Sequence, residues 1–151
     1  MAITGKLYAK FPMNMGGGDA TGDGPMDLLS DTIKLTLHTS TYSPNQSTHE
    51  TKGTDATNEL TTAGGYTALG QALGTKTYTT ASLVASFDAA DVTWTGLSVT
   101  YRYGILWDDT PTTPADPLIG YVDSGGDQTL SSTDLVFQWN SAPAIFQITV
   151  S

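Results

Sequence analysis

The chain has no cysteine and few positively charged residues. Its 151 residues include six lysines and arginines against fifteen aspartates and glutamates, a formal net charge of −9. The absence of cysteine excludes disulfides and thiolate chemistry, and it removes the commonest ligands of structural zinc. Nucleic acids and anionic membranes are bound through basic patches. Because basic side chains are so few, we expect neither as a partner.

Long apolar segments are also absent. No run approaches the ~20 apolar residues that a membrane-spanning helix needs. Residues 1–11 lack the apolar core of a secretory signal. We therefore expect a protein that is soluble where it is made. The length corresponds to one domain, since domains usually hold roughly 100 to 200 residues.

Short runs of alternating apolar and polar residues fill the last two thirds of the chain. From Leu97 to Trp107 the large apolar side chains occupy every second position, which is the period of a strand with one buried face. Threonine is frequent and good helix formers are scarce, which favours strands. Further strands are predicted at residues 31–38, 75–80, 81–87, 92–94, 117–122, 134–139 and 145–150. About seven to nine short antiparallel strands predict an all-β fold, either a β-sandwich or a jelly-roll-like barrel.

The N-terminal part lacks this alternation. Residues 16–25 are rich in glycine and contain no large apolar side chain to offset the entropy lost on ordering. We expect residues 1–25 to form a flexible N-terminal arm, followed by a single β domain over 26–151. Within the arm, residues 3–13 are compatible with a strand, a short helix or an extended segment.

A second irregular stretch lies inside the predicted β domain. Residues 39–65 consist mainly of Ser, Thr, Asn, Gly and Pro and predict a loop that is unusually long for a compact domain. Within it, residues 57–60 are compatible with one turn of helix. Residues 108–114 and 123–127 predict turns, because residues that favour bends gather there.

Few residues suggest catalysis. His49 lies beside Glu50, and a histidine next to a carboxylate can act as a general base with an orienting partner. The second histidine of a zinc-protease motif is absent four residues on, and His38 is the only other histidine in the chain. No Gly-x-Ser-x-Gly elbow or phosphate-binding loop is present. We interpret His49 and Glu50 as polar loop residues and predict no catalytic residue, no cofactor and no enzymatic activity.

Aspartates gather at three places in predicted loops. Asp19, Asp23 and Asp27 follow one another at four-residue intervals, and carboxylate oxygens on a bendable backbone suit calcium. The stretch lacks the ligand order and closing glutamate of an EF-hand loop, and whether these three bind an ion stays open. Asp108–Asp109 and the aspartates of 123–127 could meet at one end of a sandwich. Because the turn preference of aspartate accounts for all of them without an ion, we predict no metal site.

Aromatic residues offer an alternative function. A row of exposed rings would form a platform on which sugars stack, as in a carbohydrate-binding module. Most of these residues occupy inward strand positions, so we expect them in the core. They are Tyr8, Tyr42, Tyr66, Tyr78, Trp94, Tyr101, Tyr103, Trp107, Tyr121 and Trp139.

Several blocks between residues 31 and 127 resemble a family of small bacteriophage virion proteins. The blocks are DTIKLTLHTSTYSPNQ at 31–46, TNEL at 57–60 followed by GYTA at 65–68, DVTW at 91–94, YRYGILWDDTP at 101–111 and PLIGY at 117–121. None is a catalytic signature. The glycine-rich tract at 16–25 departs from what we expect of relatives, which run more directly into the strand at Asp31.

The resemblance implies a structural part of the phage particle. We take from it the expectation of a head decoration (cement) protein, made in the host cytoplasm and located on the phage head surface. It would bind the major capsid protein, and itself as a dimer or trimer, because capsid surfaces offer two-fold and three-fold positions. We expect residues 1–27 and 39–65 to make the contacts, because they are the stretches least able to order themselves. The alternative is a head-fibre, tail-associated or carbohydrate-binding β module that contacts the host surface.

Overall fold

The structure is a computed structural model that describes residues 4–16, 26–139 and 144–149. Within these ranges it holds ten strands and one short helix. In chain order these are β1 (Thr4–Leu7), α1 (Phe11–Met15), β2 (Ile33–His38), β3 (Gln71–Ala72), β4 (Thr77–Ala81), β5 (Val84–Asp88), β6 (Val92–Leu97), β7 (Thr100–Asp108), β8 (Leu118–Thr129), β9 (Thr133–Phe137) and β10 (Phe146–Thr149). The predicted all-β class is confirmed, with somewhat more strands than expected. No helix of the described ranges is long and apolar enough to cross a membrane.

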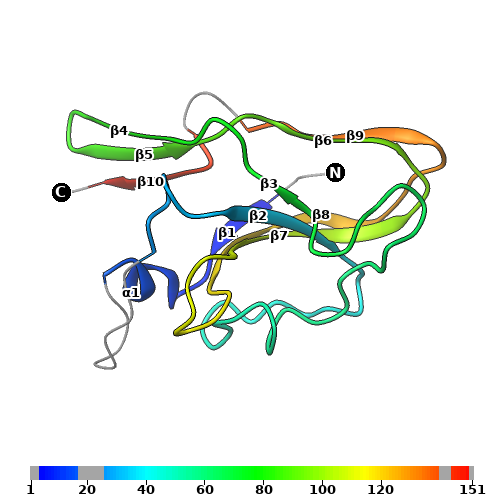
Figure 1. The fold of residues 1–151 in the computed structure, drawn as a ribbon, viewed down its shortest axis with the longest axis horizontal. Helices are drawn as coiled ribbons and strands as arrows, with labels where there is room; N and C mark the ends of the chain where they lie inside the picture. Colours follow the sequence, from blue (N-terminus) through cyan, green and yellow to red (C-terminus); the bar gives the residue numbers. More distant parts are fainter. Residues whose placement is uncertain (1–3, 17–25, 140–143, 150–151) are drawn as a thin grey trace.

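The strands form three antiparallel sheets in two layers. One sheet has five strands in the order β1-β8-β7-β2-β3, the second has the order β10-β5-β4, and the third pairs β6 with β9. Figure 1 shows the two smaller sheets in one layer above the five-stranded sheet. The described strands form no closed barrel. Of the two predicted architectures, the sandwich is therefore the one observed.

The two layers are joined at one end of the molecule, at the right of Figure 1. Strand β6 leads into β7 through Ser98 and Val99, and β8 leads into β9 through residues 130–132. The Leu130 N–H donates to the Val99 carbonyl at 2.8 Å, so the two crossing segments are themselves paired. One continuous antiparallel ribbon thus bends over and supplies strands to both layers.

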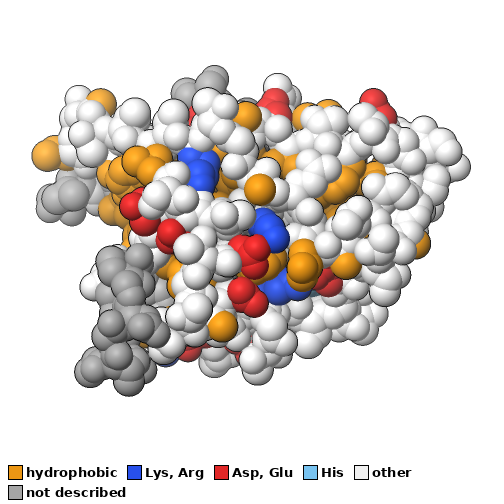
Figure 2. Space-filling model, in the orientation of Figure 1, with side chains coloured by type: hydrophobic (Ala, Val, Ile, Leu, Met, Phe, Trp, Pro, Cys, Tyr) orange, Lys and Arg blue, Asp and Glu red, His pale blue; other side chains and the backbone are white. Residues whose placement is uncertain are grey.

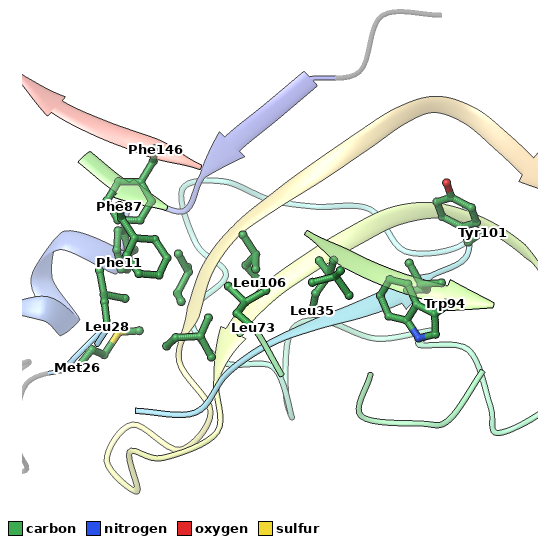
Figure 3. Close-up of a cluster of buried hydrophobic side chains, with 14 of the residues drawn as sticks. Phe11, Met26, Leu28, Leu35, Leu73, Phe87, Trp94, Tyr101, Leu106 and Phe146 are labelled. Carbon is green, nitrogen blue, oxygen red and sulfur yellow. The ribbon is translucent and has the colours of Figure 1, made fainter. Parts of the chain in front are cut away.

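The main core lies between the layers. Ile33, Leu35 and Leu37 alternate along β2 and are fully buried there, as their spacing predicted. At one end of the core α1 contributes Phe11, whose ring meets Phe146 edge-on with centroids 5.2 Å apart. Figure 3 shows this cluster running from Phe11 and Phe146 to Tyr101 and Trp94. Each fully buried side chain of this size stabilises the fold by about 1.5–3 kcal/mol.

A second hydrophobic cluster lies on the opposite face of the five-stranded sheet, beneath residues 39–65. Its members are Tyr8, Tyr42, Ala56, Tyr103, Ile105, Trp107, Leu118 and Tyr121. Strand β7 is therefore buried on both faces, whereas the alternation over 97–107 predicted one buried face. The second cover is the long loop itself, which shields the sheet although few of its own residues are apolar.

An irregularity in β7 places Tyr101 and Tyr103 on opposite faces of the sheet. The pairing of β7 with β8 shifts register between Tyr101 and Tyr103. Tyr101 lies in the core between the layers, and Tyr103 lies in the cluster beneath the loop. In a regular strand two residues at this spacing share a face, so the shift interrupts the alternation.

Residues 4–16 belong to the β domain. Strand β1 pairs with β8 at the edge of the five-stranded sheet, and Tyr8 and Phe11 are 1% and 0% exposed. The prediction of a flexible arm is wrong for these residues, because two large aromatic rings anchor them. The glycine-rich residues 17–25 lie outside the described residues.

One turn prediction is also wrong. The turn predicted at 123–127 is part of β8, where Asp123 Oδ1 accepts the Gly125 N–H at 2.9 Å and the strand bulges without ending. The helical turn that residues 57–60 would allow does not form, because Asn58 has a φ of 58° and Glu59 forms an isolated bridge with His38.

Candidate functional site

The long loop, residues 39–65, is fixed to the sheet by hydrogen-bonded aromatic side chains. The buried Tyr42 Oη lies 2.6 Å from Tyr8 Oη and 3.0 Å from His49 Nδ1. The His49 ring stacks on Tyr42 with centroids 5.8 Å apart. Burial raises the pKa of Tyr8 and raises that of Tyr42 to about 12, so both phenols stay neutral. These groups hold the loop in place.

His49 and Glu50 do not form an acid–base pair. The imidazole of His49 hydrogen-bonds to Tyr42, and Glu50 lines a separate cavity together with Lys10 and Asn14. The backbone N–H of Glu50 donates to Asp55 Oδ2 at 2.8 Å, which closes a turn of the loop.

His38, at the end of β2, is also a structural contact to the loop. Its Nδ1 lies 2.8 Å from the Thr57 carbonyl. Because a carbonyl only accepts, Nδ1 carries the proton. Nε2 lies 3.0 Å from Thr36 Oγ1, whose hydroxyl also lies 3.3 Å from the Ile105 carbonyl. Desolvation of the fully buried ring lowers the pKa of His38. The neutral imidazole thus joins the sheet to the loop.

Glu59 anchors the far end of the loop, a role that sequence reasoning missed. Its Oε1 accepts the Tyr66 hydroxyl at 2.7 Å and the Leu69 N–H at 2.6 Å, and its Oε2 pairs with Lys52 Nζ at 2.6 Å. The only signal in the sequence is that Glu59 is one of two glutamates in an aspartate-rich chain.

Two lysines cover the indole of Trp107 on the loop side of the sheet. Lys34 Nζ lies 5.4 Å and Lys52 Nζ 5.2 Å from the ring centroid. Each such contact is worth about 0.5–1 kcal/mol at exposed sites. Lys34 also pairs with Asp109 at 2.5 Å, so the Asp109 carboxylate is engaged in an ion pair.

Asp108 lies buried beside that ion pair. Its Oδ1 accepts the Thr110 N–H at 3.0 Å, and its Oδ2 accepts no hydrogen bond. Burial, reinforced by the nearby Asp31 carboxylate, raises the pKa of Asp108 to about 7. Asp108 is therefore a buried acid that carries its proton up to near-neutral pH.

The other candidate aspartates have local partners. Asp123 forms a forked ion pair with Arg102, whose Nε lies 3.0 Å and Nη2 3.1 Å from its two oxygens. Asp27 Oδ1 accepts the N–H groups of the next turn, Leu29 at 3.0 Å and Ser30 at 3.2 Å. Asp19 and Asp23 lie outside the described residues. Within 4–16, 26–139 and 144–149, no three His, Asp or Glu side chains are grouped so as to hold a metal ion.

The aromatic residues are mostly in the core, as predicted. Those that are buried are Tyr8, Tyr42, Tyr66, Trp94, Tyr101, Tyr103, Trp107 and Tyr121. Tyr78 is 36% exposed and Trp139 is half-buried. The part of the chain that the structure describes therefore displays no row of exposed rings on which sugars could stack.

The outer surface of the long loop differs chemically from its buried side. From residue 39 to residue 48 it has no charged side chain, and most residues there are exposed serine, threonine and asparagine. Short side chains lose little conformational entropy on binding. Tyr42, His49 and Glu59 already order the backbone beneath them. We call residues 39–65 the loop surface; it is preordered and rich in hydrogen-bonding groups.

Comparison with protein-family models, curated proteins and solved structures finds no match to this chain.

Proposed function

We propose that the protein is a non-enzymatic structural component of a bacteriophage virion, a head decoration protein that binds the major capsid protein lattice and stabilises the head. The sequence resemblance of residues 31–127 motivates the proposal. The structural observation that supports it is the loop surface, which is ordered before any partner is bound.

A decoration protein must add contact area across capsid subunits without disturbing their fold. A loop that is already ordered costs less conformational entropy on binding than a flexible one. The sandwich beneath it is rigid, because its core strand β7 is covered on both faces. The two histidines, His38 and His49, both hold the loop through hydrogen bonds, which supports the proposal of a structural role.

The first experiment measures the copy number of the chain in purified virions by quantitative mass spectrometry. A fixed ratio to the major capsid protein, close to one chain per subunit or per symmetry position, is expected. A few copies per particle would instead indicate a tail or head-fibre protein. Absence from the particles would overturn the proposal.

The second experiment locates the contact. Particles made without the protein are incubated with purified variants, and retention is measured after gradient sedimentation. We expect Thr48→Arg, on the loop surface, to reduce retention, and Thr95→Arg, exposed on β6 in the other layer, to leave it unchanged. The reverse result would exclude the loop surface. Deletion of residues 1–25 is not a suitable test, because it removes β1 and the core residue Phe11.

A further inference from the structure

Strand β4 is an open edge of the three-stranded sheet. In the order β10-β5-β4 it has a neighbour on one side only, and all five of its residues, Thr77–Ala81, are exposed. The hairpin of β4 and β5 projects from the body of the molecule at the upper left of Figure 1. One side of this strand therefore presents unpaired backbone groups.

Proteins usually protect such edges with a charge, a proline, a bulge or a very short strand. The other edges have these features: Lys6 in β1, Asp134 in β9, a register shift after Trp94 in β6, two residues in β3 and four in β10. Strand β4 has the sequence TYTTA, without charge or proline, and pairs with β5 without a register shift. It is thus the one described edge of this length without protection against pairing.

The charge distribution favours a second copy of this chain as the occupant. Two copies with a net charge of −9 repel each other over most of their surface. Residues 60–87 contain no acidic residue, and Asp88 is the single charged residue in the three strands of this sheet. Figure 2 shows no acidic side chains at the upper left, where the hairpin projects.

We propose that β4 pairs antiparallel with β4 of a second copy, across a two-fold axis at Thr79. The hairpin turn fixes the register. Ser82 and Leu83 both have positive φ, 47° and 66°, as in a two-residue hairpin turn. The pair Ala81 and Val84, which flanks such a turn, exchanges both backbone hydrogen bonds. Hydrogen-bonded pairs alternate along an antiparallel ladder, so Thr79 also directs its backbone N–H and C=O to β5. Tyr78 and Thr80 direct their backbone groups to the free edge.

The self-pairing uses those free groups. Thr79 faces Thr79 of the second copy as a non-hydrogen-bonded pair. Tyr78 of each copy faces Thr80 of the other, and each such pair exchanges both backbone hydrogen bonds. Aromatic and β-branched side chains are favourable cross-strand neighbours. The product is one continuous sheet with β10-β5-β4 on each side of the axis.

The hairpin tip supplies a second observation. Leu83 is 72% exposed, an unusual position for a leucine with positive φ. In this register the tip extends past Thr77 of the other copy. The next residue of that strand, Tyr78, lines a mainly apolar pocket together with Met15, Met26, Asp27, Leu28 and Leu29. An exposed leucine and an apolar pocket thus both lie on the hairpin that the pairing uses.

The test is the molar mass in solution, measured by sedimentation velocity over a concentration series. Wild type is expected to dimerise. Thr79→Lys and Thr79→Glu should each be monomeric, because like charges meet at the axis, and an equal mixture of the two should dimerise again. Gln147→Lys is the matched control, since Gln147, Ser86 and Thr79 lie side by side on one face of the sheet and Gln147 is on its far edge.

A monomeric wild type, or a Thr79→Lys variant that dimerises like wild type, would overturn the proposal. If wild type is monomeric and Thr79→Lys loses only its retention on particles, the edge accepts a strand of the shell and not a second copy. Dissociation by Gln147→Lys would place the interface elsewhere. The inference goes beyond the proposed function. Because the molar mass is measured without particles, the self-pairing of β4 and the decoration function can each fail without the other.

Discussion

The hydroxyl groups of Tyr8 and Tyr42 lie 2.6 Å apart and are both buried. This bond joins the segment after β1 to the long loop, although the two residues are 34 positions apart in the sequence. The N-terminal segment and the loop surface are consequently parts of one packed unit, with His49 as the next member of the hydrogen-bonded chain.

Tyr42→Phe should lower the free energy of unfolding by about 1–3 kcal/mol, because it leaves the buried Tyr8 hydroxyl without its partner. Urea denaturation at pH 7 measures the change. Tyr78→Phe, on an exposed residue, is the control and should change the free energy by less than about 0.5 kcal/mol. Equal stability of the two variants would contradict the anchoring role of the Tyr8–Tyr42 bond.

Gly104→Ala should destabilise the protein by about 1–3 kcal/mol through overpacking. A Cβ at this position of β7 would lie 2.8 Å from Phe137 Cε1 and 3.3 Å from Leu35 Cδ1, so the ring that β9 packs onto the sheet must move. Gly53→Ala, where nothing lies within 4 Å, is the matched control. Thermal unfolding midpoints that are equal for both variants would refute this packing argument.

Asp108→Asn should remove a loss of stability that wild type undergoes as the pH rises from about 4 to 7. The folded pKa of Asp108, about 7, lies above the ordinary value of 3.8. In that interval the folded protein keeps a proton on Asp108 that the unfolded chain has released. The contribution of Asp108 to the free energy of unfolding is therefore full at low pH and is lost as pH rises. Urea unfolding across this range measures the slopes of both proteins.

His38→Gln should have the opposite effect on the slope. The pKa of His38 is lowered below 6.5 by burial, so the unfolded chain binds the proton more tightly and wild type loses stability as pH falls through 6.5. The variant lacks that loss, so its stability relative to wild type should improve on acidification even if it is lower throughout. His38 and Asp108 act in opposite directions, and other carboxyl groups with shifted pKa values, such as Asp116 and Asp123, also contribute, so each effect is measured as the difference between variant and wild type. Parallel pH profiles for wild type and His38→Gln would show that His38 does not titrate on unfolding.

Some strands could be predicted because apolar residues alternate regularly along them. In β2 the spacing of Ile33, Leu35 and Leu37 is enough to identify both the strand and its inward face. In β7 the same pattern misled, because Tyr101 and Tyr103 belong to different clusters. A register shift depends on the partner strand, and the sequence of β7 alone contains no sign of it.

The order of the loop and of residues 4–16 could not be predicted for a related reason. Their composition is mainly polar, and a few residues hold them: Tyr8, Phe11, Tyr42 and Glu59. Each of these acts through a partner distant in sequence. Of the aspartates weighed as ion ligands, Asp27 accepts hydrogen bonds from the next turn and Asp123 pairs with Arg102, a partner 21 residues away that its local sequence does not indicate.

The two clusters on either side of the five-stranded sheet contain one buried tryptophan each, Trp107 beneath the loop and Trp94 between the layers, where the half-buried Trp139 packs as well. Indole fluorescence responds to exposure to water, so each ring is an optical reporter of its own side. With Trp139 replaced, variants that retain only one of the two would distinguish lifting of the loop from separation of the layers. A partner that peels the loop away would then be visible in the emission of Trp107 while that of Trp94 stays constant.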